Sequence, residues 1–131
     1  MGGKLNHPED DLQRAVLQYL ALAVSKHYIV VAIPNGGKRN MLEAKIMKGL
    51  GVRAGTPDIH ISGCGFSGWL ELKAEGGRLS PAQKEFRDEC LEKNIPWKEV
   101  RDVRDAEEFV TVHQLRRRRR DFPVFADPGY T

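Results

Sequence analysis

Apolar and polar positions recur along the first part of the chain with two periods, and each period predicts one kind of element. Over 8–25 the apolar residues lie three or four apart, and Pro8 followed by three acidic residues suits the first turn of a helix. The β-branched run 28–33 predicts a buried strand, which ends in the Pro-Asn-Gly-Gly turn 34–37. A short helix is predicted over 40–48, where helix formers precede two closely spaced glycines.

The second part of the chain predicts a hairpin followed by a helix, a strand and a helix. The runs 57–62 and 69–74 lie on either side of a glycine-rich segment, which is typical of two antiparallel strands. A serine cap, a proline and a glutamine open a helix over 80–93, and a strand follows over 97–103. An aspartate cap predicts the last helix over 105–115.

The predicted order, α-β-α-β-β-α-β-α, indicates an α/β fold in which helices flank a mixed β-sheet. The 131 residues suffice for a single domain, which we expect to span 1–115, with an arginine-rich tail over 116–131. Apolar runs such as 29–33 are too short to cross a membrane. Because the amino-terminal residues also lack the apolar core of a secretory signal, we expect a cytoplasmic protein with no membrane contact.

The net charge of +3 is unevenly distributed along the chain. Residues 1–115 contain 16 basic and 16 acidic groups, whereas 116–131 contain five arginines and two aspartates. A uniformly basic coat is therefore excluded for the body of the protein. Within this neutral body the segment 34–57 has a balance of +4 and the segment 85–108 a balance of −4.

The two strands of the predicted hairpin carry the most informative polar residues. Side chains alternate between the two faces of a strand, so pairing the apolar faces puts Asp58, Glu71 and Lys73 on one common surface. Two carboxylates at such a place can bind a hard divalent cation, because magnesium takes one or two carboxylates and completes its shell with water and phosphate. The alternative is a solvated sheet face, with Glu71 and Lys73 in a weak exposed pair.

These residues belong to an ordered set of motifs. Thr56-Pro57-Asp58 is followed thirteen residues later by Glu71-Leu72-Lys73, which resembles the PD-(D/E)xK nuclease signature. With Pro34-Asn-Gly-Gly37 before it and Gly77-Arg-Leu-Ser-Pro-Ala-Gln83 after it, the chain resembles the VRR-NUC domain, in the small stand-alone form carried by phages and prophages. The resemblance covers roughly 9–110 and leaves the arginine run outside the family pattern.

The resemblance implies a restriction-endonuclease-like fold and a metal-dependent active site. Asp58 and Glu71 would bind Mg²⁺ or Mn²⁺, the backbone carbonyl of Leu72 would add a ligand, and no small-molecule cofactor is expected. Lys73 would orient the attacking water and stabilise charge on the phosphate. His60, on the same strand face as Asp58, is expected to be an ordinary hydrogen-bonded histidine.

Three further residues have two explanations each. Glu9 matches the acid that completes such a site from the first helix, and Gln13 lies one turn further on the same helix face. The helix dipole alone also explains an acid in the first turn. Gln83 matches a catalytic glutamine of the family, whereas a capping box explains it without catalysis.

The expected substrate is DNA, because the basic segment leads directly into the acidic site. The expected nucleic-acid contacts are Asn35, Gly36, Gly37, Lys38, Arg39, Lys45, Lys48, Arg53, Arg116 and Arg117. A plain turn at 35–37, a solvated helix for Lys45 and Lys48, and a solvated helix end at 116–120 are the alternatives. No base-reading motif is present, which favours recognition of DNA structure over DNA sequence.

The leading interpretation is therefore a structure-selective DNA endonuclease that cleaves branched or four-way (Holliday) junction DNA. The resemblance further implies a homodimer, in which two sites address two strands. A nucleic-acid-binding accessory protein that retains the nuclease fold without turnover is the second hypothesis. A protein-interaction module that uses the acidic segment 85–108 is the third.

Overall fold

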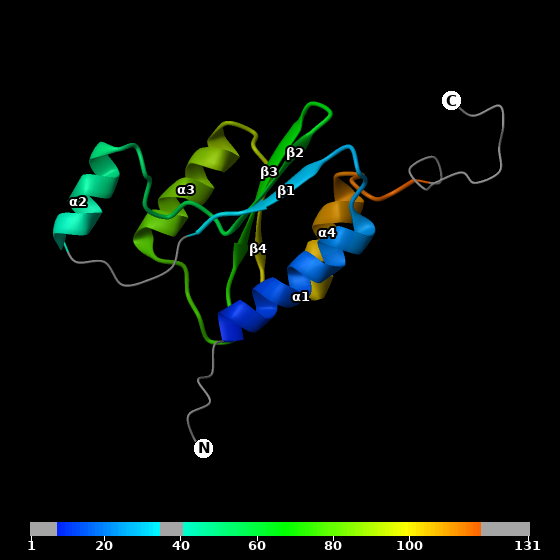
Figure 1. Cartoon of the computed structure of the whole chain (residues 1–131), viewed down its shortest axis with the longest axis horizontal. Helices are drawn as coiled ribbons and strands as arrows, with labels where there is room; N and C mark the ends of the chain where they lie inside the picture. Colours follow the sequence, from blue (N-terminus) through cyan, green and yellow to red (C-terminus); the bar gives the residue numbers. More distant parts are fainter. Residues whose placement is uncertain (1–7, 35–40, 119–131) are drawn as a thin grey trace, which may run out of the picture.

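A four-stranded sheet forms the centre of the structure, a computed structural model that describes residues 8–34 and 41–118 (Figure 1). The strands are β1 (Ile29–Ala32), β2 (Ile59–Gly63), β3 (Phe66–Leu72) and β4 (Trp97–Val100), in the spatial order β1-β2-β3-β4. The helices are α1 (Pro8–Ala23), α2 (Met41–Gly49), α3 (Pro81–Glu92) and α4 (Val103–Val112). The predicted element order and the α/β class are confirmed.

The sheet is mixed, as predicted. β1 pairs antiparallel with β2, β2 antiparallel with β3, and β3 parallel with β4. The β2–β3 hairpin is tighter than predicted, because only Cys64 and Gly65 form its loop between the paired residues Gly63 and Phe66. Both loop residues have positive φ, 50° and 78°, which is the backbone of a two-residue turn that matches strand twist. Residues 66–68, which lie before the predicted strand 69–74, therefore belong to β3.

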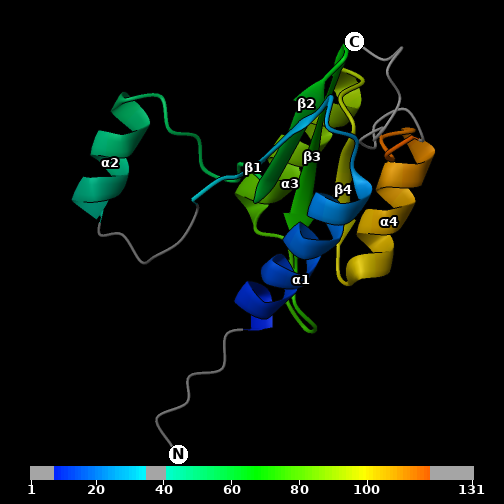
Figure 2. The ribbon, with the colours of Figure 1, turned by 45° about the vertical axis from the view of Figure 1, so that its right-hand side comes forward.

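Helices cover the two faces of the sheet differently. α1 and α4 pack side by side over one face, and α3 lies on the other, as Figures 1 and 2 show together. The main apolar core fills the space between the sheet and the first pair of helices. Its largest fully buried side chains are Val16, Leu20, Ile59, Ile61, Leu70, Val100, Val110 and Leu115. The alternation predicted for 57–62 and 69–74 thus directs the apolar face toward α1 and α4.

Two details of the prediction are wrong. The β-branched run at β1 is not a buried strand: β1 lies at the edge of the sheet, and Ile29 is 65% exposed. α4 begins two residues earlier than predicted, because Asp102 is its N-cap and accepts a hydrogen bond from the backbone N–H of Asp105. Asp105, the predicted cap, is instead the N3 residue of this capping box.

α2 extends away from the sheet and its covering helices (Figures 1 and 2). It leaves the sheet after β1 and returns through the loop before β2. Ile46 is 55% exposed and Leu50, directly after the helix, is 76% exposed. Within the described ranges, no helix is long and apolar enough to cross a membrane.

Candidate active site

The hairpin brings Asp58, Glu71 and Lys73 to one end of the sheet. Asp58 lies just before β2, and its backbone N–H donates to the Leu70 carbonyl at 3.1 Å. One carboxylate oxygen of Asp58 accepts a hydrogen bond from the backbone N–H of Leu72 at 2.8 Å. Lys73, just after β3, is held by its own N–H, which donates to the Val100 carbonyl at 3.0 Å. The strand pairing therefore fixes the backbone of all three residues.

The burial of Glu71 shows whether this surface is a solvated sheet face or a binding site. Glu71 is only 2% exposed, and its Oε1 atom is buried without a hydrogen-bond partner. Burial, and after it the neighbouring Asp58 carboxyl, raise the pKa of Glu71 from an ordinary 4.5 to about 9, although Lys73 acts in the opposite direction. A weak exposed pair with Lys73 is therefore the wrong description of this carboxyl group.

The arrangement of the two carboxyl groups fits a bound divalent cation. Glu71 and Asp58 lie close enough for a hydrogen bond when Glu71 is protonated, but two ionised carboxylates can share such a place only with a cation between them. Across the described residues no three His, Cys, Asp or Glu side chains form a metal cluster. Magnesium needs fewer, since water and phosphate complete its shell. An all-oxygen donor set suits Mg²⁺ or Mn²⁺ better than zinc.

Gln83 closes the capping box of α3 and also contacts Glu71, whereas its catalytic role stays a prediction. The side-chain Oε1 of Gln83 accepts a hydrogen bond from the Ser80 backbone N–H at 2.8 Å. The backbone N–H of Gln83 donates to the Ser80 hydroxyl at 3.2 Å, which completes the capping box of α3. The remaining amide nitrogen, Nε2, lies 3.4 Å from Oε2 of Glu71 and donates to it. Because the oxygen of the amide is engaged by the cap, only the nitrogen can face Glu71.

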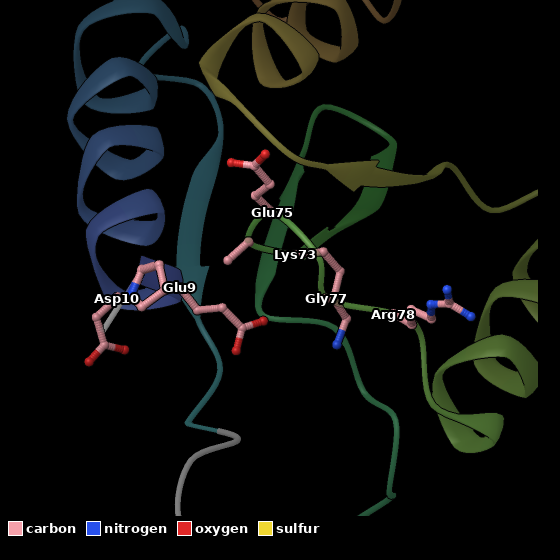
Figure 3. Close-up of a pocket in the computed structure, with 8 residues that line it drawn as sticks. Glu9, Asp10, Lys73, Glu75, Gly77 and Arg78 are labelled. Carbon is pink, nitrogen blue, oxygen red and sulfur yellow. The ribbon is translucent and has the colours of Figure 1, made fainter. Parts of the chain in front are cut away.

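A cavity of about 410 Å³, lined in part by Lys73, lies between the start of α1 and the turn that follows β3 (Figure 3). Glu9 and Lys73 extend toward one another across it (Figure 3). The negative charge of Glu9 also raises the pKa of Glu71, so Glu9 lies within electrostatic reach of the carboxylate pair. Gln13 is half-buried one turn further along α1, and its part in the site stays a prediction.

Comparison with known proteins adds one finding to this geometry. The solved structure of a VRR_NUC domain protein superposes with a TM-score of 0.62 at 20% sequence identity, over 86% of this chain and 90% of that one. The chain has the VRR-NUC fold. No family model matches the sequence, and no curated protein is significantly similar to it in sequence. The restriction-endonuclease-like architecture expected from the motifs is thus confirmed at the level of the fold.

The VRR-NUC fold places the predicted nucleic-acid contacts unequally. Asn35, Gly36, Gly37, Lys38 and Arg39 lie outside the described residues. Lys45 and Lys48 are exposed on α2. Arg53 already has partners, because it donates to Glu89 at 2.7 Å and its guanidinium lies 4.7 Å from the centre of the Phe86 ring. Arg53 is therefore less available to a phosphate than Lys45 and Lys48.

Arg116 and Arg117 lie at the other end of α1 from Glu9. Arg116 forms a β-bridge with Val24, and Arg117 donates to the carbonyls of Ala21 and Ala23. The sixteen residues of α1 span about 24 Å, so these arginines are remote from the carboxylate pair. Cationic donors at the last carbonyls of a helix stabilise its negative end. Arg116 and Arg117 therefore pack against the end of α1 and its following residue. Their contact with DNA stays a prediction.

Two structural supports of the site were not singled out from the sequence. Gly55 lies so close to the first turn of α3 that a Cβ would be 2.3 Å from the Ala82 carbonyl oxygen. Arg101 donates to the Ala74 carbonyl at 3.2 Å and so holds the turn after Lys73. The Gly-x-Pro sequence before Asp58 was a signal for the first support, whereas nothing in the sequence around Arg101 indicates the second.

His60 is confirmed as a hydrogen-bonded histidine. Its Nε2 is paired with the Ser67 hydroxyl at 2.9 Å, and its ring centre lies 4.3 Å from that of Trp69. Both partners belong to the neighbouring strand β3. Its packing is therefore explained by the sheet alone.

Proposed function

We propose that this chain is a divalent-metal-dependent DNA endonuclease that hydrolyses phosphodiester bonds in branched or four-way junction DNA. The observation that carries the proposal is the buried Glu71 carboxyl, whose Oε1 has no partner and whose neighbour is Asp58. A buried carboxyl group without a partner is costly unless a cation or a proton neutralises it. The fold shared with a VRR_NUC domain protein agrees with the proposal. Asp58, Glu71 and Lys73 of the motif lie together at one end of the sheet.

Each residue has a defined task in the proposed reaction. Asp58 and Glu71 hold Mg²⁺ or Mn²⁺, with the backbone carbonyl of Leu72 as a further oxygen ligand. When bound, the cation supplies polarisation of the phosphoryl oxygen and a lowered pKa for a bound water. The Lys73 ammonium stabilises charge that develops on the phosphate. The amide of Gln83 keeps Oε2 of Glu71 in place, which leaves Oε1 for the metal.

Wild-type protein is expected to cleave a junction or flap substrate in Mg²⁺ or Mn²⁺ and to be inactive in EDTA. Asp58→Ala and Lys73→Ala are each expected to lose cleavage by at least about 100-fold, because removal of one charge-stabilising group typically costs that much. The assay uses labelled duplex, flap and four-way junction DNA with single-turnover rates. Lys98→Ala is the matched control, since Lys98 pairs with the exposed Glu108 and is expected to retain the wild-type rate.

Two outcomes contradict this proposal in different ways. Cleavage that survives both substitutions in folded, contaminant-free protein shows that another site is responsible. Salt-dependent DNA binding without cleavage in either metal, over the whole substrate panel, supports the non-catalytic accessory protein instead.

The proposal includes a homodimer formed through α2 and β1. A nine-residue helix that stands apart from its own domain is marginal in water, so α2 needs a surface to pack against. β1 offers an unpaired edge with Ile29 exposed, and a two-fold axis lets the same edge of a second copy pair with it.

Wild-type protein is accordingly expected to have twice the chain mass of 14.8 kDa in light scattering or sedimentation. Leu50→Asp is expected to reduce the mass to that of one chain, because it introduces charge into the exposed apolar surface of the α2 segment. Leu91→Asp is the control, since Leu91 is 77% exposed on α3, outside the proposed interface. A monomeric wild type, or equal dissociation by both variants, contradicts the interface.

A further inference from the structure

The cavity that Lys73 lines has walls of opposite charge. Glu9 and Asp10 line it from the start of α1, and Lys73 and Arg78 line it from the segment after β3. Glu75 lies between these two in the sequence, but its carboxylate extends away from both (Figure 3). The proposed hydrolysis uses only Lys73 from the second wall. Arg78 therefore brings a charge to this cavity that the chemistry of the scissile phosphate does not require.

Arg78 differs from nearly all other arginines of the structure. Most arginines in the described ranges have an ion pair or a hydrogen bond, among them Arg14, Arg53, Arg87, Arg101 and Arg116. Arg117 and Arg118 are also engaged. Within residues 8–34 and 41–118, only Arg78 and Arg104 have neither, and of these two only Arg78 lines the cavity. An exposed guanidinium without a protein partner keeps all of its donors available for a ligand.

The side chains of Lys73 and Arg78 point to different places. In Figure 3 the ammonium of Lys73 extends into the space before Glu9, whereas the guanidinium of Arg78 extends away from it, toward α3. Two cations that converge could bind one phosphate together. Cations that diverge from neighbouring positions suit two successive phosphates of one strand, since a nucleic-acid backbone presents a regular row of negative charges.

The turn that carries Arg78 is fixed in place. The Ala74 carbonyl accepts hydrogen bonds from the Gly77 backbone N–H at 2.9 Å and from Arg101 at 3.2 Å. Arg101 is itself oriented by Glu99, to which its Nε donates at 2.6 Å. A fixed backbone lowers the ordering cost when the side chain binds a ligand.

We infer that Arg78 binds the DNA phosphate next to the scissile one, as a second phosphate contact outside the metal site. This inference rests on the proposed endonuclease function. It assigns Arg78 a role in holding the cleaved strand in register with Lys73. The guanidinium geometry matters as well as its charge, because arginine binds phosphate through two parallel hydrogen bonds and lysine through a point charge.

The test is a double-mutant cycle that combines a substitution of Arg78 with a chemical change of one DNA phosphate. Cleavage by wild type is first mapped, and a neutral methylphosphonate then replaces each phosphate flanking the cut, one at a time. Arg78→Ala is expected to lower kcat/KM by about 10- to 100-fold, as expected for one charge-assisted hydrogen bond. At one adjacent position the methylphosphonate is expected to slow wild type by a similar factor and to cause no further loss in Arg78→Ala.

Three comparisons make the result decisive. Arg104→Ala is the matched control and is expected to behave as wild type on every substrate. Arg78→Lys is expected to restore part of the loss, and Arg78→Ala is expected to reduce the salt slope of DNA binding by about 0.9. Additive losses at every methylphosphonate position overturn the assignment of Arg78 while leaving the nuclease intact. A wild type that cleaves no substrate overturns the proposed function instead.

Discussion

Replacement of Glu71 by glutamine is expected to abolish DNA cleavage and, at the same time, to make the metal-free protein more stable at alkaline pH. The amide has nearly the shape of the carboxyl group but no charge. It removes an oxygen ligand that carries negative charge, and metal-ion stabilisation contributes several kcal/mol to such a transition state. We expect at least about a 1,000-fold loss of cleavage, since each 1.4 kcal/mol is a factor of ten.

The stability effect follows from the raised pKa of Glu71. Its pKa is about 9 in the folded, metal-free protein and ordinary, 4.5, in the unfolded chain. Between these values the folded state holds the proton more tightly, so its stability is fully present below the lower pKa and falls as pH rises toward the higher one. Glu71→Gln cannot lose a proton, and its stability is expected to lack this decline.

Urea unfolding in EDTA, followed from pH 5 to pH 9, measures the second effect. The stability difference between Glu71→Gln and wild type is expected to grow with pH in favour of the variant. Glu85→Gln, an exposed residue on α3, is the control for a general change in charge and is expected to parallel wild type. A Glu71→Gln variant that cleaves at the wild-type rate, or that loses stability with pH as steeply as wild type, contradicts the role given to this residue.

Gly55→Ala is expected to be the most destabilising small substitution near the site. Gly55 has φ +80°, and a Cβ would lie 2.3 Å from the Ala82 carbonyl oxygen and 2.8 Å from the Gln83 nitrogen. Both contacts are with backbone, so a side-chain rotation cannot relieve them. Strain from the left-handed backbone costs about 1–2 kcal/mol and overpacking about 1–3 kcal/mol. The total loss of unfolding free energy is therefore about 2–5 kcal/mol.

Gly51→Ala separates the two contributions to that loss. Gly51 has φ +90°, but nothing lies within 4 Å of its Cβ position. It is expected to lose only the backbone component, about 1–2 kcal/mol, in the same urea titration. Equal losses in the two variants would show that the loop moves away from α3 without cost. Gly55→Ala is also expected to lower cleavage in Mg²⁺, because the displaced turn carries Gln83.

The sequence was sufficient for those parts of the site that depend on local pattern. Alternation along two strands predicts that Asp58 and Glu71 lie on one common surface, and the serine, proline and glutamine after them predict the start of α3. Both predictions rest on neighbours within a few residues, where backbone geometry fixes the direction of a side chain. For the same reason Gln83 could be given two explanations, and the structure combines them in one amide group.

Features that depend on distant neighbours could not be derived in this way. β1 is rich in β-branched residues, as a buried strand would be, but its exposure follows from its place at the edge of the sheet. Arg53 was counted with the basic segment, yet Glu89 and Phe86 of α3 occupy its guanidinium. The burial of Glu71 depends on its position in the centre of the folded sheet, which a single strand pattern does not contain.

The hydrogen bond between Gln83 and Glu71 also connects the site to the motion of a helix. Gln83 lies in the first turn of α3, and the same amide closes the cap of that turn. When this turn frays, Gln83 leaves Glu71 and the carboxyl group regains water. A bound cation would keep Glu71 ionised. The ionised carboxylate would then hold the Gln83 amide more strongly and oppose this opening. Amide protons at the start of α3 would then exchange with solvent more slowly, so the helix would report on site occupancy.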